Sequence, residues 1–290
     1  MTTAPARDVE SDAARLLDTV AHGQVGIFPT DVGYAIVGNS ESAIARIFAC
    51  KQRSFDKACG MFSNWEMFLA LATVGDRERA IVDTVIHQHR LPLSVVTPHR
   101  VEHPFFAKLT PLTRERSSRG DTIDMLLNAG ALHDEVARLA WQRAVPVLGS
   151  SANQSLSGSK YRLADVERAV RDEADLVIDY GETKYSHPAG MGSSIIALPS
   201  LTPIRKGIKF DEICEIIAER FGSDPAASRR QTSLDVERRG QNTGSPTSSV
   251  RYFLANRLDR RPVRGHSRLR HAPGLVDVAL ARGLARLEHG

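Results

Sequence analysis

The sequence has few cysteines, no long apolar run and no export signal. Its three cysteines, Cys50, Cys59 and Cys214, are scattered over 290 residues without a CxxC pair. An odd, dispersed set argues against a disulfide framework and a thiolate zinc site, and it is typical of a reducing compartment. No stretch of about 18 apolar residues occurs, and the acidic N-terminal region lacks the apolar core of a signal peptide. We therefore expect a cytoplasmic protein with no membrane span.

Several large enzyme classes lose their main support because their motifs are missing. The sequence contains no GxGxxG, GxxxxGK[ST], HExxH or GxSxG. These absences argue against dinucleotide-binding, P-loop, zincin and α/β-hydrolase enzymes. We interpret the histidines between residues 87 and 103 as surface residues and predict no metal site.

The charge is distributed unevenly along the chain. The formal net charge is +4, yet residues 223–290 hold 13 Arg, no Lys and 6 acidic residues, while residues 1–222 hold 25 basic and 28 acidic residues. The last 68 residues are rich in Arg, Ser, Gly and Pro without apolar periodicity, a composition that cannot offset the entropy of ordering. We predict one folded domain over 1–222 and a mostly disordered, Arg-rich tail over 223–290.

Helical and strand-like patterns alternate along the first 222 residues. We predict helices over 9–20, 41–51, 65–72, 79–87, 133–142, 163–170 and 211–221, and strands over 25–28, 58–62, 93–97, 122–127, 145–149, 174–178 and 194–198. Helices and strands that alternate at such short intervals indicate an α/β fold, with a mixed sheet more consistent than a purely parallel one.

Polar and cationic residues gather in four segments at predicted strand or helix ends. They are Pro29–Tyr34, Lys51–Arg53 with Lys57 beyond, Gly149–Ser155, and Gly192–Ile196 followed by Pro203–Gly207. Together they supply several cations, hydroxyls and an amide. That combination suits a polyphosphate and a small polar acid.

Each segment also has a simpler interpretation. Lys51 and Arg53 could complement a helix dipole, a contribution of about 0.3 to 1 kcal/mol. Residues two apart do not share a helix face, so both can reach one ligand only where the helix has ended. Ser151 and Asn153 could merely close a turn, and Thr30 and Asp31 could merely cap or turn the chain.

The order of these motifs resembles a known family. The sequence is similar to the YrdC-like threonylcarbamoyl-AMP synthases in the order of four motifs. These are PTDxxY, then KxR with a Lys four residues on, then SAN before a Ser/Gly-rich loop, and last paired Ser before a β-branched run and RxG. The resemblance spans about residues 10–210. It implies a twisted mixed sheet flanked by helices around a large, positively charged concave cavity.

The resemblance also implies a reaction. ATP, L-threonine and bicarbonate would give threonylcarbamoyl-AMP and pyrophosphate, the first step toward threonylcarbamoyladenosine in tRNA, with Mg²⁺ expected alongside ATP. Lys51 and Arg53 would hold phosphates, and Ser151 and Asn153 would fix the nucleotide and the reacting carboxylate. The further substrate- or ATP-binding residues would be Thr30 on the amino-acid side, Ser193 and Arg205 on the ATP side, and Tyr34 and Lys57.

The sequence departs from the family pattern at one important position. Counted back from Ser151 without gaps, the family's substrate-binding Arg falls on Ala129. Loss of such a clamp on a carboxylate lowers affinity by roughly a hundredfold or more. Arg116 or Arg119 could take its place. Otherwise the substrate is a related small acid or another carbamoyl compound, or the protein is a module that binds double-stranded RNA or tRNA without synthase activity.

Overall fold

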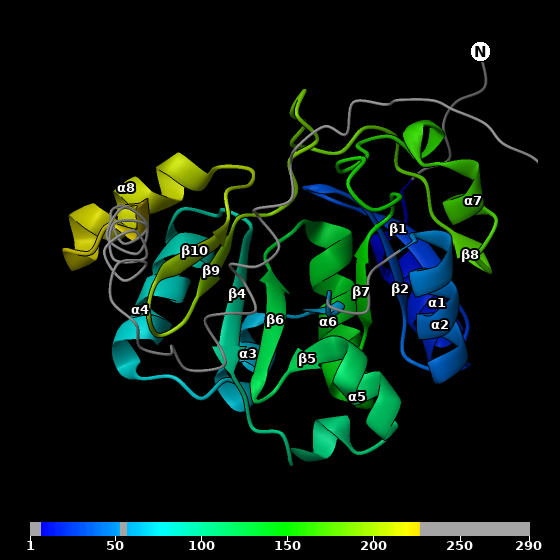
Figure 1. Ribbon diagram of the computed structural model, residues 1–290, viewed down its shortest axis with the longest axis horizontal. Coiled ribbons are helices and arrows are strands. Elements are labelled where there is room, and N and C mark those ends of the chain that lie inside the picture. The colour runs from blue at the N-terminus through cyan, green and yellow to red at the C-terminus, as the bar shows by residue number, and fades with distance from the viewer. Residues whose placement is uncertain (1–6, 53–56, 227–290) are drawn as a thin grey trace, which may run out of the picture. The chain divides into compact units, whose positions relative to one another are not determined.

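A mixed sheet of ten strands runs through the residues that the computed structural model describes, 7–52 and 57–226 (Figure 1). The strands are β1 (Gly26–Thr30), β2 (Gly33–Gly38), β3 (Gly60–Phe62), β4 (Leu93–Pro98), β5 (Ser118–Arg119), β6 (Thr122–Leu127), β7 (Leu148–Ser151), β8 (Leu176–Val177), β9 (Ile195–Ala197) and β10 (Thr202–Arg205). Their order is β10-β9-β4-β6-β3-β7-β2-β1-β8, and β5 pairs with β6.

Helices connect most of these strands. They are α1 (Val9–Ala21), α2 (Glu41–Cys50), α3 (Trp65–Leu71), α4 (Asp76–Asp83), α5 (Pro111–Ser117), α6 (Ala131–Arg143), α7 (Arg168–Arg171) and α8 (Phe210–Phe221). A π-helical turn over Thr84–Gln88 follows α4, and 3₁₀ turns occupy Pro104–Phe106 and Leu163–Asp165.

The predicted α/β fold with a mixed sheet is confirmed. Strand pairs β3/β6, β4/β9 and β1/β8 are parallel. The pairs β1/β2, β2/β7, β3/β7, β4/β6, β5/β6 and β9/β10 are antiparallel. Short loops can join the antiparallel neighbours, whereas the parallel pairs need longer crossover connections.

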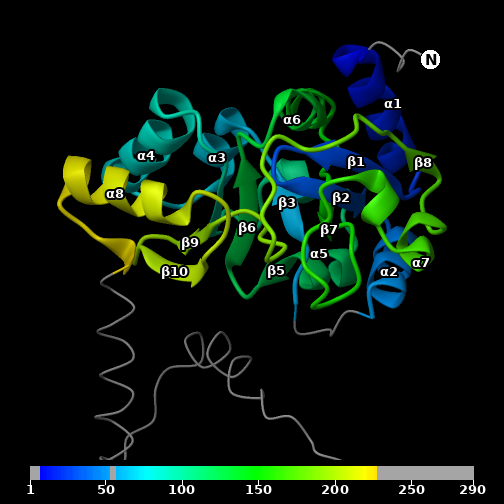
Figure 2. The ribbon, with the colours of Figure 1, turned by 90° about the horizontal axis from the view of Figure 1, so that it is seen from above.

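Alternation along the central strands divides the core into two layers. Ile27 and Ile36 pack with α2 residues in one cluster, while Phe28 and Val37 pack with α1 and α6 residues in the other. Successive side chains of a strand point to opposite faces, so one register fixes both layers. Figure 2 shows α1 and α6 on one side of the sheet and α2 on the other.

Helix α2 is bounded by clear local signals. Ser40 caps its first turn, with the hydroxyl accepting the Ala43 N–H at 3.1 Å. Ile44 and Ile47 bury its apolar face. Lys51 ends the helix, and Gln52 follows in a left-handed conformation with φ of 47°. The helix therefore ends at the KxR motif. That is the condition under which both cations of the motif could reach one ligand.

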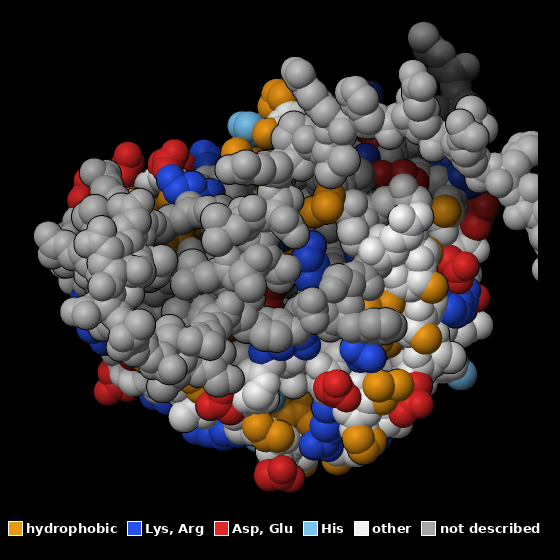
Figure 3. Space-filling view, in the orientation of Figure 1, with side chains coloured by type: hydrophobic (Ala, Val, Ile, Leu, Met, Phe, Trp, Pro, Cys, Tyr) orange, Lys and Arg blue, Asp and Glu red, His pale blue; other side chains and the backbone are white. Residues whose placement is uncertain are grey.

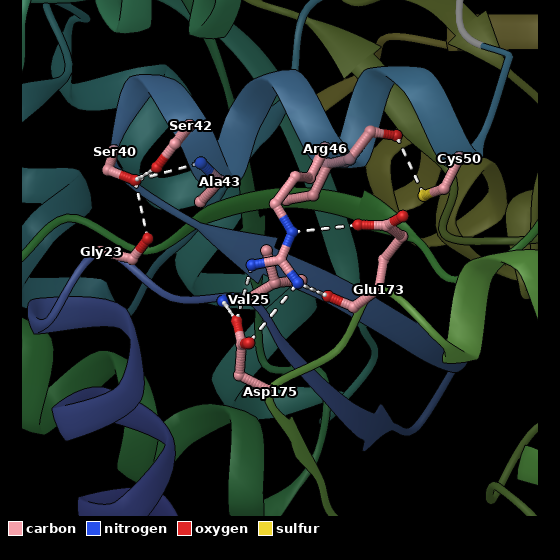
Figure 4. Close-up of polar contacts among 10 residues, drawn as sticks. Gly23, Val25, Ser40, Ser42, Ala43, Arg46, Cys50, Glu173 and Asp175 are labelled. Carbon is pink, nitrogen blue, oxygen red and sulfur yellow. Dashed lines mark hydrogen bonds and ion pairs between the residues drawn. The ribbon is translucent and has the colours of Figure 1, made fainter.

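An ion-pair network fastens α2 to the segment before β8 (Figure 4). The Arg46 guanidinium lies 3.0 Å from a Glu173 carboxylate oxygen and 2.9 Å from an Asp175 carboxylate oxygen. The Asp175 carboxylate also accepts the Val25 N–H at 2.8 Å, next to the start of β1. These side chains are about a third exposed, so solvent screens the ion pairs and their net contribution is modest.

Some elements differ from the sequence prediction. Strands β2, β5 and β10 and helix α5 were not predicted, and the helix predicted over 163–170 is a 3₁₀ turn followed by the single turn α7. Strand β2 is buried on both faces, so its run of apolar residues lacks the alternation that marks a half-buried strand. Strand β10 contains Pro203 and lies at the sheet edge, where proline is tolerated.

Helix α8 ends at Phe221, and Gly222 follows in a left-handed conformation with φ of 64°. The chain divides into two units, Met1–Gly244 and Ser245–Gly290, and the described residues belong to the first. The predicted disordered tail lies outside the described residues from position 227 onward, and the domain boundary at residue 222 stays a prediction. None of the helices within 7–52 and 57–226 has the length and apolar character needed to cross a membrane.

Candidate functional site

The first candidate segment forms the tight turn between β1 and β2. Thr30 pairs with Gly33 across the turn, and the Thr30 hydroxyl donates to the Gly33 carbonyl at 2.7 Å. The same hydroxyl accepts the Val32 N–H at 3.3 Å. The buried Thr30 side chain therefore closes the turn, as the simpler interpretation holds, and its contact with an amino-acid substrate stays a prediction.

Tyr34 lies inside β2, and its side chain is buried. Its hydroxyl oxygen lies 2.5 Å from an Asp179 carboxylate oxygen and 2.9 Å from the Gly181 carbonyl oxygen. Burial, followed by the neighbouring Asp179 carboxylate, raises the pKa of Tyr34 well above its usual value, so the phenol stays protonated. Tyr34 thus anchors the segment around residue 180 to the sheet, and a role in substrate binding stays a prediction.

The KxR and SxN motifs meet at Lys51. Its side chain is 1% exposed although it comes from the C-terminal end of α2. The Lys51 ammonium donates to the Ser151 carbonyl and, at 2.5 Å, to the Asn153 carbonyl. The Lys51 carbonyl in turn accepts the Ser155 N–H at 2.9 Å. Two segments about 100 residues apart in sequence are therefore joined directly.

The other predicted members of these segments are less fully placed. Arg53 lies outside the described residues. Lys57 is half-buried just before β3, and Ser151 is half-buried at the end of β7, where it pairs with Ala35. The proposed roles of Arg53, Lys57 and Ser151 stay predictions.

Asn153 carries an unpaired, buried acceptor. The residue is 5% exposed. Its Nδ2 donates to the Gln154 carbonyl at 2.6 Å and lies 3.5 Å from the Ser157 hydroxyl, whereas its Oδ1 has no hydrogen-bond partner among the described residues. A buried acceptor left unpaired costs about 1 to 3 kcal/mol. An N–H or O–H of a ligand placed at this oxygen would recover that energy.

The loop after Asn153 contacts the first candidate segment and the chain just before the fourth. The Lys160 carbonyl accepts the Tyr34 N–H at 2.8 Å, and the Gly190 carbonyl accepts the Ser159 N–H at 2.8 Å. Gly158 and Gly190 approach so closely that a Cβ at Gly190 would lie 2.8 Å from the Gly158 Cα. Only residues without a side chain permit this contact.

Arg205 lies at the same junction. Its guanidinium donates to the Ser193 hydroxyl and to the Ser193 carbonyl, each at 2.9 Å, and the Ser193 hydroxyl lies 3.0 Å from that of Ser94. A Cβ added at Gly192 would lie 3.2 Å from the Arg205 guanidinium and 3.0 Å from the Ser159 hydroxyl. The fourth segment therefore reaches the loop of the third, and Ser193 positions the Arg205 cation.

The position of the expected substrate-binding arginine is occupied by a small, buried residue. Ala129 is fully buried, and its carbonyl accepts the Asp31 N–H at 2.6 Å. Arg116 instead lies over the Phe48 ring at 5.8 Å, and Arg119 donates to the Ser118 carbonyl at 2.9 Å.

A cation that the sequence reasoning did not identify stands near Ala129. The Lys184 ammonium lies 3.6 Å from an Asp31 carboxylate oxygen and 4.9 Å from the centre of the Tyr185 ring. Burial raises the pKa of Asp31, and Lys184 partly offsets that effect. No motif surrounds Lys184. The Tyr185 N–H, which donates to the Asp31 carbonyl at 2.9 Å, ties this segment to the β1–β2 turn together with the Lys184–Asp31 ion pair.

The described residues contain no group of three His, Cys, Asp or Glu side chains that could hold a metal ion. Mg²⁺ often binds through substrate phosphates and only one or two carboxylates. Such a mode needs no dedicated cluster, so the expectation of Mg²⁺ with ATP stays a prediction.

The fold and the converging motifs define a YrdC-like domain. The Sua5/YciO/YrdC family model, described as telomere recombination, matches residues 18–207. This chain belongs to that family. No curated protein matches the chain significantly.

Solved structures share the fold at low sequence identity. A hypothetical protein, smu.1377c from Streptococcus mutans UA159, aligns with a TM-score of 0.61 and 20% identity over 72% of this chain and 91% of its own. P. abyssi Sua5, crystallised with L-threonine, aligns with a TM-score of 0.58 and 23% identity over 73% of this chain and 59% of its own. E. coli YciO aligns with a TM-score of 0.51 and 18% identity over 69% of this chain and 90% of its own. The chain thus matches less than two thirds of Sua5.

Proposed function

We propose that this protein is a nucleotidyltransferase that forms threonylcarbamoyl-AMP and pyrophosphate from ATP, L-threonine and bicarbonate. The observation that carries the proposal is the contact of the buried Lys51 ammonium with the carbonyls of Ser151 and Asn153, beside an Asn153 Oδ1 that has no partner in the part of the chain that the structure describes. Membership of the Sua5/YciO/YrdC family supports it.

The proposed chemistry needs positioning and positive charge more than a nucleophilic side chain. An N-carboxylated amino acid attacks the α-phosphate of ATP, and pyrophosphate leaves with added negative charge. Lys51 contacts the start of the Ser/Gly-rich loop at Asn153, Arg205 lies near Ser159 later in the loop, and Arg53 follows Lys51 in sequence. Cations placed near the phosphates would stabilise this developing charge.

The second substrate is a small acid. A related fold, that of P. abyssi Sua5, was crystallised with L-threonine, which supports an amino acid in this role. The buried Ala129 and the nearby Lys184 favour a second candidate, in which a related small acid or carbamoyl compound replaces threonine.

A pyrophosphate-release assay on the purified full chain tests the proposal. Release from ATP should require both threonine and bicarbonate, and a panel of small acids in place of threonine tests the second candidate. We expect Asn153→Leu, which keeps the side-chain size but removes the acceptor, to lower the rate at least about tenfold. Gln88→Leu removes an exposed amide and serves as the matched control. Absence of pyrophosphate release with every acid would refute an adenylating enzyme.

The alternative of RNA binding without synthase activity depends chiefly on the Arg-rich tail. On the face shown in Figure 3, Lys and Arg side chains stand beside Asp and Glu side chains along the rim. Residues 1–222 carry 25 basic and 28 acidic residues, so their overall charge does not favour a polyanion. Strongly salt-dependent tRNA binding that disappears on deletion of residues 223–290 would support this alternative.

A further inference from the structure

One carboxylate holds the loop that carries Asn153 at three points. The Glu167 carboxylate accepts the Gln154 N–H at 3.2 Å and the Ser157 hydroxyl at 2.7 Å. It also lies 3.1 Å from the Lys160 ammonium, and the Glu167 side chain is 24% exposed. The three contacts fall at the beginning, middle and end of the loop, so a single side chain fixes its whole course.

This network reaches the Asn153 amide through two of its members. The Asn153 Nδ2 donates to the Gln154 carbonyl at 2.6 Å and lies 3.5 Å from the Ser157 hydroxyl. Gln154 and Ser157 are both held by Glu167. Because the amide is planar, fixing Nδ2 on this side directs Oδ1 to the other, where it is buried and has no partner among the described residues.

The loop also contains a residue in an unfavourable conformation. Leu156 has φ of 72° and is 86% exposed. A leucine rarely adopts a left-handed backbone unless its surroundings impose it. The contacts of Glu167 to Gln154 and Ser157 lie on either side of Leu156 and support this conformation, together with the Ser157 N–H, which donates to the Gln154 carbonyl at 3.2 Å. Removing the Glu167 carboxylate should therefore loosen the loop and the orientation of the Asn153 amide.

Glu167 is ionised at neutral pH. Burial raises the pKa of Glu167, but the hydrogen bonds from Ser157, Lys160 and the backbone outweigh burial and hold the pKa below its usual value. The carboxylate can therefore only accept hydrogen bonds, which suits its three donors.

From this geometry we propose that Glu167 is a positioning residue that orients Asn153 Oδ1 as a hydrogen-bond acceptor for the nucleotide. The proposal rests on the proposed function, because ATP is the ligand it assigns to Asn153. Glu167 itself need not contact the nucleotide.

Calorimetric titration of the full-length protein with ATP tests this role. We expect Glu167→Ala to weaken ATP binding about tenfold, the effect of losing one charge-assisted hydrogen bond. Glu167→Gln keeps one acceptor oxygen and should weaken ATP binding about threefold. Glu173→Ala is the matched control, because Glu173 is also an ion-paired acid, 38% exposed, but it contacts Arg46 instead of the loop. Its ATP affinity should equal that of the wild type.

Two further readouts separate positioning from a general structural role. The thermal unfolding midpoints of Glu167→Gln and wild type should agree while their ATP affinities differ. In the pyrophosphate assay, KM for ATP should rise and KM for the small acid should stay unchanged. A Glu167→Ala protein that binds ATP like the wild type, or loses affinity only in proportion to lost folded protein, overturns the positioning role. A wild-type protein that binds no ATP overturns the proposed function, and the assigned ligand with it.

Discussion

Replacing Lys51 by alanine should destabilise the protein as well as inactivate it. The ammonium is buried and donates to the carbonyls of Ser151 and Asn153. Removing the side chain leaves these two acceptors without that donor, at about 1 to 3 kcal/mol each. Relaxation of the loop and entry of water recover part of this cost, so we expect a loss of about 2 to 5 kcal/mol.

That loss is large beside the total stability of a domain, about 5 to 15 kcal/mol. Urea unfolding followed by circular dichroism measures it through the shift of the midpoint at a constant slope. Lys108→Ala is the matched control, since Lys108 is exposed, and it should change the free energy of unfolding by less than about 0.5 kcal/mol.

The result also distinguishes two roles of Lys51. If Lys51→Ala loses pyrophosphate release but unfolds at the wild-type midpoint, the ammonium does not hold the SxN loop, and the reasoning from its two carbonyl contacts is refuted. If the variant is destabilised, activity must be compared under conditions in which both proteins are folded. Lys51→Met, which retains the apolar part of the side chain, should then separate packing from hydrogen bonding.

Two further predictions concern the fold. Burial lowers the pKa of His99, although its bond to the Asp121 carbonyl, at 2.7 Å, opposes this. The folded state thus favours neutral His99. Its contribution to the free energy of unfolding is complete above the pKa of histidine in the unfolded chain, and it is lost as the pH falls below that value. When the pH falls from about 7.5 to about 5.5, the thermal unfolding midpoint of His99→Gln should fall less than that of the wild type. An equal fall in both proteins would show that protonation of His99 does not destabilise the fold. Gly33→Ala should cost about 1 to 3 kcal/mol in urea unfolding, because φ is 127° and a Cβ would lie 3.1 Å from the Lys160 carbonyl oxygen. Gly120→Ala, with φ of 58° and open space around it, should cost less, and equal costs would exclude the close contact as the cause.

Local signals predicted many elements well. The Ser40 cap and the spacing of Ile44 and Ile47 gave helix α2 correctly, including its end at Lys51. The hairpin of β1 and β2 was missed, because a strand buried on both faces shows no alternation and its turn contains no Asn-Gly or similar pair. The prediction of one helix over 163–170 was wrong. Its apolar residues lie in two separate short turns, the 3₁₀ turn Leu163–Asp165 and the α-helical turn α7.

The sequence motifs singled out candidate site residues, whose roles stay predictions. The motifs identified Lys51 and Asn153, and the structure brings them together. Glu167 and Lys184 were not identified, since neither belongs to a motif and each contacts a partner that is separated from it in sequence.

The sequence by itself determined the family, the alternating helices and strands, and the uneven charge, which is mildly acidic over residues 1–222 and Arg-rich beyond them. These follow from residue spacing and charge, which are local properties. Only the tertiary structure decided that Lys51 donates to the SxN carbonyls and that Asn153 Oδ1 has no partner among the described residues. Hydrogen bonds across such sequence distances depend on strand order and loop course, which no local pattern encodes.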